Sequence, residues 1–390
     1  MAVPFSYNVR SVLGRPWSAL ATALGIGLVV AILVLALALA AGFQASLVET
    51  GSPDNVIVMR KGADSELSSG VVRDAAAIIA SGPEVARGPG EKPLASPEVV
   101  VLINQDRKGG KGSSNVTIRG VDPDGLALRS GLKIVEGRNF TPGTAEVIVA
   151  RRMAARFEGF GLGQSVRLGQ HGFAIVGHFD AGGSAFDSEI WGDNAVLMPA
   201  LQRGDAAFQS VTFRMRDPSR FAAIKKELEA DPRLRVQARQ ESEYYAAQSE
   251  GLATTIRIAG IMIVIIMAVG AIFAAMNTMF ASVGARTREI ATLLTLGFGP
   301  GSVMLSFVAE SVLIALAGGV IGCLLALPIN GTATSTTNFS TFSEVAFAFR
   351  ITPPALVTGL VFSFVLGVVG GLLPAWRAAR LPLAAAMRAL

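Results

Sequence analysis

Residues 286–299 read RTREIATLLTLGFG, and the rest of the chain can be ordered around this segment. Apolar or small residues recur in it at helical spacing, at Ile290, Leu293, Leu294 and Gly297. This pattern predicts a short amphipathic helix. Gly297 and the Gly299-Pro300 pair are expected to end it, because glycine accepts a left-handed cap and proline cannot continue a helix.

The first turn of this helix is crowded with charge, at Arg286, Arg288 and Glu289. Long apolar segments lie on both sides, and arginines between membrane spans are typical of the cytoplasmic side. Two interpretations are open on these residues alone. The helix either docks onto a cytoplasmic partner, for which we favour an ATPase, or is a connector lying at the lipid headgroups.

The composition indicates a membrane protein with a sizeable water-exposed part. Of 390 residues, 51% are hydrophobic and 16% charged, which is little charge for a soluble protein. The net charge of +5 comes largely from arginines near the apolar runs, so no nucleic-acid partner is implied. The single cysteine, Cys323, excludes an intrachain disulfide.

Four long apolar runs exceed the roughly 20 residues that cross a bilayer. They are residues 17–43, 258–285, 302–327 and 351–376. The first could instead be a signal peptide cleaved after Ala38-Leu39-Ala40, but its length favours an uncleaved anchor. An interfacial helix is expected within residues 1–16, where Arg10 and Arg15 can reach headgroups.

The segments between the runs complete the expected organisation: an α+β domain at 44–257, the cytoplasmic helix at 286–299, a polar hairpin at 328–350 and a cytoplasmic tail at 377–390. The domain's predicted strands are 55–59, 99–103, 115–119, 146–150, 165–168, 173–176 and 211–215. Its predicted helices are 71–80, 151–157 and 219–230, and a further helix at 240–251 is expected to run into the second span.

The arginines predict the orientation. Seven lie in short segments assigned to the cytoplasm and two at the opposite span ends. The seven are Arg10, Arg15, Arg286, Arg288, Arg377, Arg380 and Arg388, and the two are Arg257 and Arg350. Both termini are therefore expected in the cytoplasm, with the α+β domain outside.

Motifs for catalysis or nucleotide binding are absent from the sequence. Residues 106–114, DRKGGKGSS, read as a flexible loop and fail the phosphate-loop pattern, since Lys111 precedes a glycine. His171 and His178 are seven residues apart in a predicted strand, which puts them on opposite faces and argues against a shared metal. We expect a non-catalytic protein that holds no metal or cofactor of its own.

The apolar runs carry one acidic residue, Glu310. It is either a buried partner of Arg286 or Arg288, or a coupling residue, or a carboxylate that reaches the cytoplasmic interface; the last interpretation is favoured at this stage. The pairs Gly318/Gly322 and Gly367/Gly371 have the spacing that lets membrane helices pack closely. Ser184, Glu189 and Trp191 fall in an acidic and aromatic stretch that could contact a partner, since tryptophan is enriched at interfaces.

A family resemblance is carried by residues 277–322, NTMFASVGARTREIATLLTLGFGPGSVMLSFVAESVLIALAGGVIG. This segment resembles the core of the MacB/FtsX-type ABC transporter permeases. The matching features are the asparagine before the cytoplasmic turn, R-T-R-E-I, L-G, F-x-x-E and G-G-x-x-G. Residues 135–140 and 146–150 look like the family's periplasmic domain, and 374–388 look like its tail.

The resemblance implies a permease homodimer in a bacterial inner membrane, seated on two copies of a separate ATPase that would hold the ATP and Mg²⁺. The helix from Arg286 to Leu296 would dock in a groove of that ATPase. The periplasmic domain would comprise a porter-like lobe, from about 44–120 and 205–255, with a sabre-like lobe between. ATP binding would close the spans and move this domain, an action called mechanotransmission.

The resemblance leaves three functions open. Export of cargo from the periplasmic side, with a periplasmic adaptor or membrane fusion protein, is the one we favour. Extraction of lipoproteins or lipids is the second, and FtsX-like regulation of a periplasmic cell-wall hydrolase is the third. A sensing receptor is not expected, because only 14 residues follow Trp376.

Overall fold

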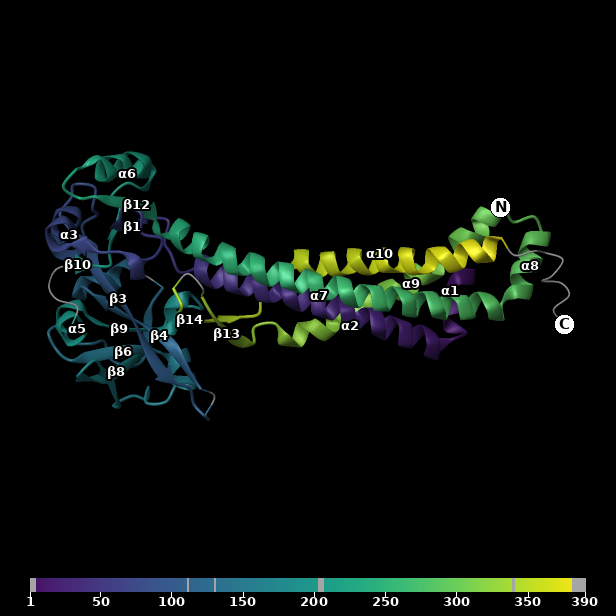
Figure 1. Cartoon of the computed structure of the whole chain (residues 1–390), viewed down its shortest axis with the longest axis horizontal. Helices are drawn as coiled ribbons and strands as arrows, with labels where there is room; N and C mark the ends of the chain where they lie inside the picture. Colours follow the sequence, from purple (N-terminus) through teal and green to yellow (C-terminus); the bar gives the residue numbers. More distant parts are fainter. Residues whose placement is uncertain (1–4, 111, 130, 203–206, 339–340, 381–390) are drawn as a thin grey trace. The chain divides into compact units, whose positions relative to one another are not determined.

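The computed structural model describes residues 5–110, 112–129, 131–202, 207–338 and 341–380 (Figure 1). The chain divides into two units. The membrane unit contains residues 1–41, 254–332 and 349–390, and the α+β unit contains 42–253 and 333–348. Arg388, which entered the orientation count, lies outside the described residues.

Four helices are long and apolar enough to cross a membrane, as predicted: α2 (Pro16–Val48), α7 (Glu241–Ala285), α9 (Pro300–Ala326) and α10 (Pro353–Ala379). The predicted helix at 240–251 is the start of α7, which continues without a break into the second span. Two short helices join them, α1 (Phe5–Leu13) and α8 (Thr287–Thr295). A 3-10 turn, η6 (Leu327–Ile329), follows α9.

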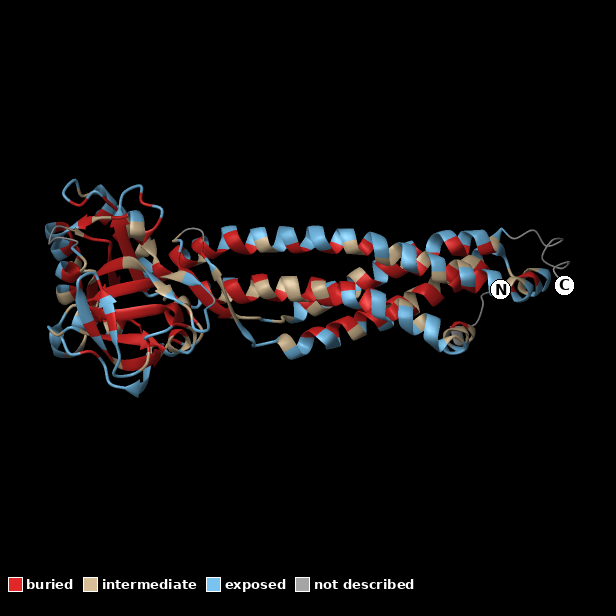
Figure 2. Cartoon of the chain, turned by 60° about the horizontal axis from the view of Figure 1, so that its bottom comes forward, coloured by how far each residue is buried: buried red, intermediate tan, exposed pale blue. Residues whose placement is uncertain are grey.

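The core of the membrane unit lies on the inner faces of these helices. Ile26, Val30 and Val34 of α2 pack with Ala315 of α9 and Leu366 of α10. The opposite faces are exposed, as Figure 2 shows by its alternation of buried and exposed turns. Large apolar side chains on such faces are suited to contact with lipid rather than water.

The α+β unit is built on a ten-stranded mixed sheet with the order β12-β1-β11-β3-β4-β9-β6-β8-β5, and β7 pairs with β8. The strands are β1 (Asn55–Arg60), β3 (Ala95–Asp106), β4 (Ser113–Val121), β5 (Lys133–Gly137), β6 (Glu146–Ala150), β7 (Ser165–Leu168), β8 (His171–Asp180), β9 (Glu189–Asp193), β11 (Ser210–Arg214) and β12 (Val236–Gln240). A small ladder joins β2 (Val71–Val72) to β10 (Ala207–Phe208).

Helices complete the α+β unit. They are α3 (Arg73–Ala80), α4 (Arg151–Arg156), α5 (Asn194–Ala200) and α6 (Phe221–Ala230), with 3-10 turns η1 (Glu66–Ser68), η2 (Pro89–Glu91), η3 (Pro123–Leu128), η4 (Ala185–Ser188) and η5 (Pro218–Arg220). Buried side chains of α3 and α6 pack with those of β1, β11 and β12 in one hydrophobic cluster.

Each predicted strand is present, whereas β5, β9 and β12 were missed. β9 escapes the usual alternation because all five of its residues, including Glu189 and Asp193, are buried. The predicted helix at 71–80 begins with two strand residues, β2. β3 is twelve residues long and pairs with β11 through its first part and with β4 through its second. β4 then pairs with β9, which lies in the segment expected to form the other lobe, so residues of both expected lobes share one sheet.

The polar segment at 328–350 contains a β-hairpin of β13 (Ala333–Thr337) and β14 (Glu344–Ala348), antiparallel from Ala333↔Ala348 to Thr337↔Glu344. The hairpin belongs to the α+β unit. Arg107 and Arg156 both donate hydrogen bonds to the buried Glu344 carboxylate. The backbone N–H of Ala346 donates to Ser188 Oγ at 2.7 Å.

Candidate functional site

Helix α8 is fixed to the membrane unit by its buried face and by a well-formed end. Ile290 is fully buried in a cluster with Met279, Val303, Phe307 and Ala375. At the C-terminus Gly297 adopts φ +92°, its N–H donates to Leu294 O, and the N–H of Phe298 donates to Leu293 O. These two bonds are the Schellman pattern, which satisfies the last carbonyls of a helix.

Arg286, at the start of α8, is the centre of a buried polar cluster. Its Nη1 donates to Glu310 Oε2 at 3.0 Å, and its Nε donates to Glu289 Oε2 at 2.9 Å. Ser11 Oγ of α1 donates to Glu310 Oε1 at 3.0 Å. The Arg286–Glu310 pair therefore joins three helices, α1, α8 and α9. A buried charge is stable only beside an opposite charge, so this pair fixes the start of α8 against α9.

Glu310 is thus a buried partner of Arg286, with 4% of its surface exposed. The favoured interpretation, that its carboxylate reaches the cytoplasmic interface, is wrong. The reason is that Glu310 lies at a position of α9 that faces α1 and the start of α8, where the carboxylate accepts bonds from Ser11 and Arg286.

The electrostatics favour the charged forms of Arg286 and Glu289. Burial opposes the charge of Arg286, but the hydrogen bond to Glu289 and the charge of Glu310 outweigh it, so the pKa of Arg286 is raised. The hydrogen bond from Arg286 lowers the pKa of Glu289. The Arg286 guanidinium also lies 4.8 Å from the ring centre of Tyr7, which adds a favourable cation–π contact.

The residues expected to contact an ATPase separate into two groups. Arg286 and Ile290 are buried within this chain, so they hold α8 in place and are not available to a partner. Arg288, Glu289 and Gly297 are exposed, and Leu293 and Leu294 are half-buried. Thr292 and Leu296 lie within the expected docking helix but were not singled out, and both are exposed. Leu296, at the C-terminal end of α8, is 66% exposed.

Helix α1 is also more than an interfacial anchor. Two of its polar residues bond to other parts of the membrane unit: Asn8 is buried and accepts a hydrogen bond from Ser306, while Tyr7 donates to Glu289 at 3.0 Å. The sequence analysis expected an interfacial helix here and did not anticipate these polar contacts. The signal available in the sequence was the run Tyr7-Asn8, whose polar groups recur with Ser11 at helical spacing.

Each of the four glycines chosen for helix packing lies at a close approach. A Cβ added to Gly318 of α9 would lie 2.5 Å from Ala23 O of α2. A Cβ added to Gly322 of α9 would lie 2.4 Å from Gly27 O of α2. A Cβ added to Gly367 of α10 would lie 2.7 Å from the Ala315 side chain of α9, and one added to Gly371 would lie 2.5 Å from the Ser311 side chain. The glycines therefore let α2, α9 and α10 approach backbone to backbone.

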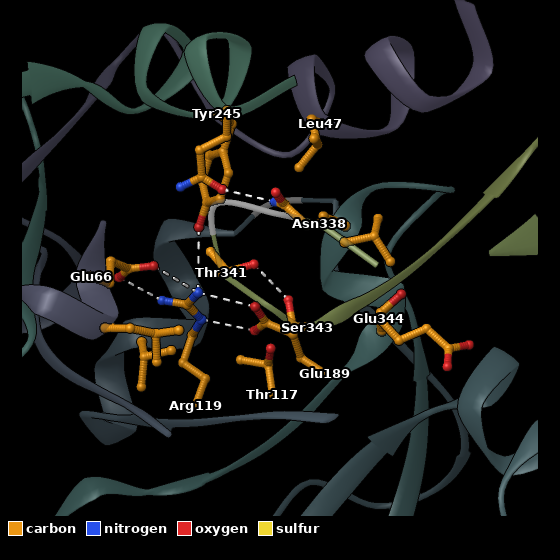
Figure 3. Close-up of a pocket in the computed structure, with 16 residues that line it drawn as sticks. Leu47, Glu66, Thr117, Arg119, Glu189, Tyr245, Asn338, Thr341, Ser343 and Glu344 are labelled. Carbon is orange, nitrogen blue, oxygen red and sulfur yellow. Dashed lines mark hydrogen bonds and ion pairs between the residues drawn. The ribbon is translucent and has the colours of Figure 1, made fainter. Parts of the chain in front are cut away.

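The proposed partner contact at Ser184, Glu189 and Trp191 is wrong, because the side chains are buried within this chain at 4%, 7% and 0% exposure. Glu189 accepts hydrogen bonds from the Trp191 indole at 2.8 Å and from Arg119 Nε at 2.8 Å. Figure 3 shows the Arg119 guanidinium between Glu66 and Glu189, with the Tyr245 hydroxyl directed toward it.

This charge network extends to a second guanidinium. Arg119 also bonds Glu98 at 2.7 Å, and Arg129 bonds Glu98 at 3.0 Å and lies 2.9 Å from Glu241. Four buried carboxylates therefore share two guanidinium groups. Burial raises the pKa of Glu189 although Arg119 opposes this, whereas the carboxylates raise the pKa of Arg119 despite its burial. The network holds η1, β3, β4, β9 and the start of α7 together.

Among the described residues, no group of three or more His, Cys, Asp or Glu side chains could hold a metal ion. His178 is buried on β8, with Nδ1 2.8 Å from Glu136 and Nε2 2.9 Å from Phe160 O. Its partners are those of a structural histidine.

Two family models match the chain. Residues 19–231 match the MacB-like periplasmic core domain, and residues 261–383 match the FtsX-like permease C-terminal domain. The first match covers more than half of the chain and includes α2 and most of the α+β unit. The second includes α8, α9 and α10.

Curated relatives match parts of the chain. A macrolide export ATP-binding/permease protein MacB 1 of Aeromonas hydrophila is 26% identical over 285 residues, 68% of this chain and 42% of that protein. A MacB of Burkholderia cenocepacia is 31% identical over 46% of this chain and 26% of that protein. A pyoverdine export ATP-binding/permease protein PvdT of Pseudomonas entomophila is 27% identical over 64% of this chain and 39% of that protein. The chain thus spans less than half the length of each.

Two solved structures are also similar. The periplasmic region of MacB from Actinobacillus actinomycetemcomitans matches at 12% identity and TM-score 0.38, over 52% of this chain and 95% of that one. The extracellular domain of the ABC-type transporter YknZ matches at 14% identity and TM-score 0.36, over 47% of this chain and 99% of that one.

Proposed function

Because the chain belongs to the MacB/FtsX-type family of ABC transporter permeases, we propose that it couples nucleotide hydrolysis by a cytoplasmic ATPase to movement of its α+β unit in the periplasm. The observation that supports this proposal is the anchoring of α8. Arg286 and Ile290 fix its inner side to the spans, so a force applied to the exposed side reaches α7 and α9 directly.

The proposed complex contains two copies of this chain and two of a separate ATPase subunit in a bacterial inner membrane, with both termini cytoplasmic. The ATPase would hold ATP and Mg²⁺. Its contact on this chain would be the exposed side of α8, formed by Arg288, Glu289, Thr292 and Leu296. An apolar side chain ringed by polar ones is a common pattern for the centre of a protein interface.

We propose export from the periplasmic side, by mechanotransmission and with a periplasmic adaptor, as the activity of this complex. The apolar runs of the spans carry Glu310 as their acidic residue, and it is neutralised by Arg286. A pathway for polar cargo would need more polar groups facing inward. The relatives named above are described as macrolide and pyoverdine exporters, which favours export over extraction of lipoproteins or lipids.

A second candidate is regulation of a periplasmic cell-wall hydrolase, which the FtsX-like match over residues 261–383 favours. In that case the same movement of the α+β unit would activate an enzyme instead of handling cargo. The two functions predict different periplasmic companions: an adaptor for export and a hydrolase for regulation. Mild crosslinking of the full chain, followed by identification of what co-purifies, distinguishes them.

The coupling proposal is tested on the exposed side of α8. Arg288→Glu and Leu296→Asp should each lower the ATP hydrolysis that co-purifies with the full chain by roughly tenfold or more, because interface centres lose about 2 kcal/mol or more on substitution. The matched control is Arg10→Glu, an exposed arginine on α1. Co-purified activity that is unchanged in both α8 variants would contradict the proposal.

A further inference from the structure

Two exposed arginines lie at the C-terminal end of α10. The uncharged run of this span ends at Trp376, and Arg377 and Arg380 follow it. All three side chains are exposed. Tryptophan and basic residues at the end of a span are typical of the layer that lipid headgroups occupy, so both arginines lie where a headgroup can reach them. The coupling proposed for α8 uses neither of them.

Each of the two guanidinium groups is held by an aromatic ring. That of Arg377 lies over the ring of Phe280 on α7, 5.7 Å from its centre. That of Arg380 lies 4.4 Å from the centre of the Trp376 ring. A cation–π contact uses the face of the guanidinium, so the N–H donors at its edge stay available to a ligand. Among the described residues, neither arginine side chain has a carboxylate partner or a hydrogen bond.

The apolar surface that leads to these arginines is exposed. Val369, Leu373 and Trp376 are 45%, 52% and 48% exposed. They and Arg380 follow one another at spacings of three or four residues, so they lie on one face of α10. This face is an apolar stripe that ends in an aromatic ring and a guanidinium, which suits the acyl chain and the headgroup of one lipid.

The charge of the two arginines indicates which kind of headgroup fits. Phosphate oxygens accept paired, charge-assisted hydrogen bonds from a guanidinium. Two positive charges without a carboxylate partner attract a headgroup with a net negative charge, whereas the ammonium of a zwitterionic headgroup would be repelled. An acidic surface of a protein partner would also complement the charge. The exposed apolar stripe on the same face of α10 favours a lipid instead.

We propose that Arg377 and Arg380 form a binding site for an anionic phospholipid. Its phosphate accepts hydrogen bonds from both guanidinium groups, which are neighbours on α10 because they are three residues apart. One of its acyl chains lies along Leu373 and Val369. The site holds lipid whether or not α8 contacts an ATPase, so it is independent of the proposed coupling.

The experiment uses the full chain, purified in a non-ionic detergent and depleted of lipid. Phosphatidylglycerol, phosphatidylcholine and inorganic phosphate are titrated separately, and native mass spectrometry measures the dissociation constant of the tightest site. Each basic residue near a membrane surface strengthens binding of an anionic lipid about fivefold. We therefore expect phosphatidylglycerol to bind about tenfold more tightly than phosphatidylcholine or better, and inorganic phosphate to bind far more weakly than either.

The variants are Arg377→Gln, Arg380→Gln and the two combined. Each single substitution should weaken phosphatidylglycerol binding roughly fivefold, and the double variant roughly twentyfold or more. The matched control is Arg10→Gln, which removes an exposed arginine of α1 and should bind like the unaltered chain. Because Arg377 and Arg380 are exposed and make no hydrogen bond in the described protein, all variants should keep the melting temperature in phosphatidylcholine.

Several results would overturn the proposal. They are equal affinities for the two lipids, phosphatidylglycerol binding that is the same in the double variant as in Arg10→Gln, and inorganic phosphate that binds as tightly as phosphatidylglycerol. A further one is unaltered lipid binding by the double variant together with loss of co-purified ATP hydrolysis, which would assign the two arginines to a protein contact.

Discussion

Arg286 and Glu310 show how a single pair can organise three helices. Glu310→Gln leaves Arg286 buried with Glu289 as its remaining carboxylate partner. Removing one member of a buried pair typically costs about 3–5 kcal/mol, and we expect the lower end because Glu289 remains. The measurement is the free energy of unfolding in mixed micelles.

The control for that substitution is Glu289→Gln, since the Glu289 side chain is 58% exposed. It should cost under about 1 kcal/mol, as exposed ion pairs do. The double variant Arg286→Met with Glu310→Met should recover much of the loss, because no unpaired charge is then left buried. Equal losses for the two single glutamine variants would contradict the assignment of Glu310 as the main partner.

Glu146 gives a pH dependence with a definite sign. The hydrogen bond from Arg138 lowers the pKa of Glu146 from 4.5 to about 2. The folded state therefore gains stability from this pair above pH 4.5 and loses it as the pH falls toward 2. The effect should be small, because the Arg138 side chain is 56% exposed and solvent screens the pair.

The corresponding measurement compares melting temperatures at pH 5 and pH 3. The unaltered chain should lose more stability over this interval than Glu146→Gln, which has no carboxyl at this position to protonate. An identical decrease in both proteins would show that Glu146 contributes nothing to the acid response.

Residue types alone could indicate the segment proposed to contact an ATPase, but not which of its residues are buried and which are exposed. Helical spacing placed Ile290 and Leu293 on one face, yet only the packing of α9 and α10 shows that Ile290 is inaccessible. The prediction that Trp191 contacts a partner was wrong for a related reason. An acidic and aromatic stretch looks like a surface, and its burial depends on Arg119, which lies 72 residues earlier in the chain.

At the scale of the helices, the small residues of α9 determine how closely α2 can pack. Gly322→Ala should destabilise the membrane unit by about 1–3 kcal/mol, since the new Cβ would lie 2.4 Å from Gly27 O and overpacked cores lose that much. Gly25→Ala of α2 is the control, with nothing within 4 Å of the added Cβ. Denaturation in mixed micelles measures both, and equal destabilisation would contradict this packing role.

Helices and strands that follow from the pattern of their own residues were predictable. Those that depend on contacts with residues far away in the sequence were not. The spans follow from uncharged runs, β7 follows from a short alternating segment, and β6 follows from a short apolar run. β9 was missed because its acidic ends have partners outside the strand: Glu189 pairs with Arg119 of β4, and Asp193 accepts from the backbone N–H of Gly143. The glycine pairs could be found from spacing, but the identity of the partner helix for each pair required the structure.

At the scale of the whole chain, the membrane and α+β units are joined by four chain crossings rather than two. The hairpin between α9 and α10 supplies two of them. It is attached to the α+β unit through the two arginines on Glu344, and also through Asn338, which donates to Gln248 Oε1 at 3.3 Å. Under the proposed function, movements of α9 and α10 therefore reach the α+β unit through this hairpin as well as through α2 and α7.

The attachment of the hairpin can be weakened at Glu344 without altering a span. Glu344→Gln removes the charge that Arg107 and Arg156 share, and hydrogen bonds to charged groups contribute about 1.5–3 kcal/mol. Since 1.4 kcal/mol is a factor of ten in an equilibrium, amide hydrogens of residues 344–348 should exchange about ten times faster or more. Exchange in α8 should be unchanged, and Glu250→Gln, an exposed position on α7, is the control. Unaltered exchange in the hairpin would mean that its backbone pairing and the Ser188 contact hold it without the ion pairs, and the hairpin would then remain attached when Glu344 is neutral.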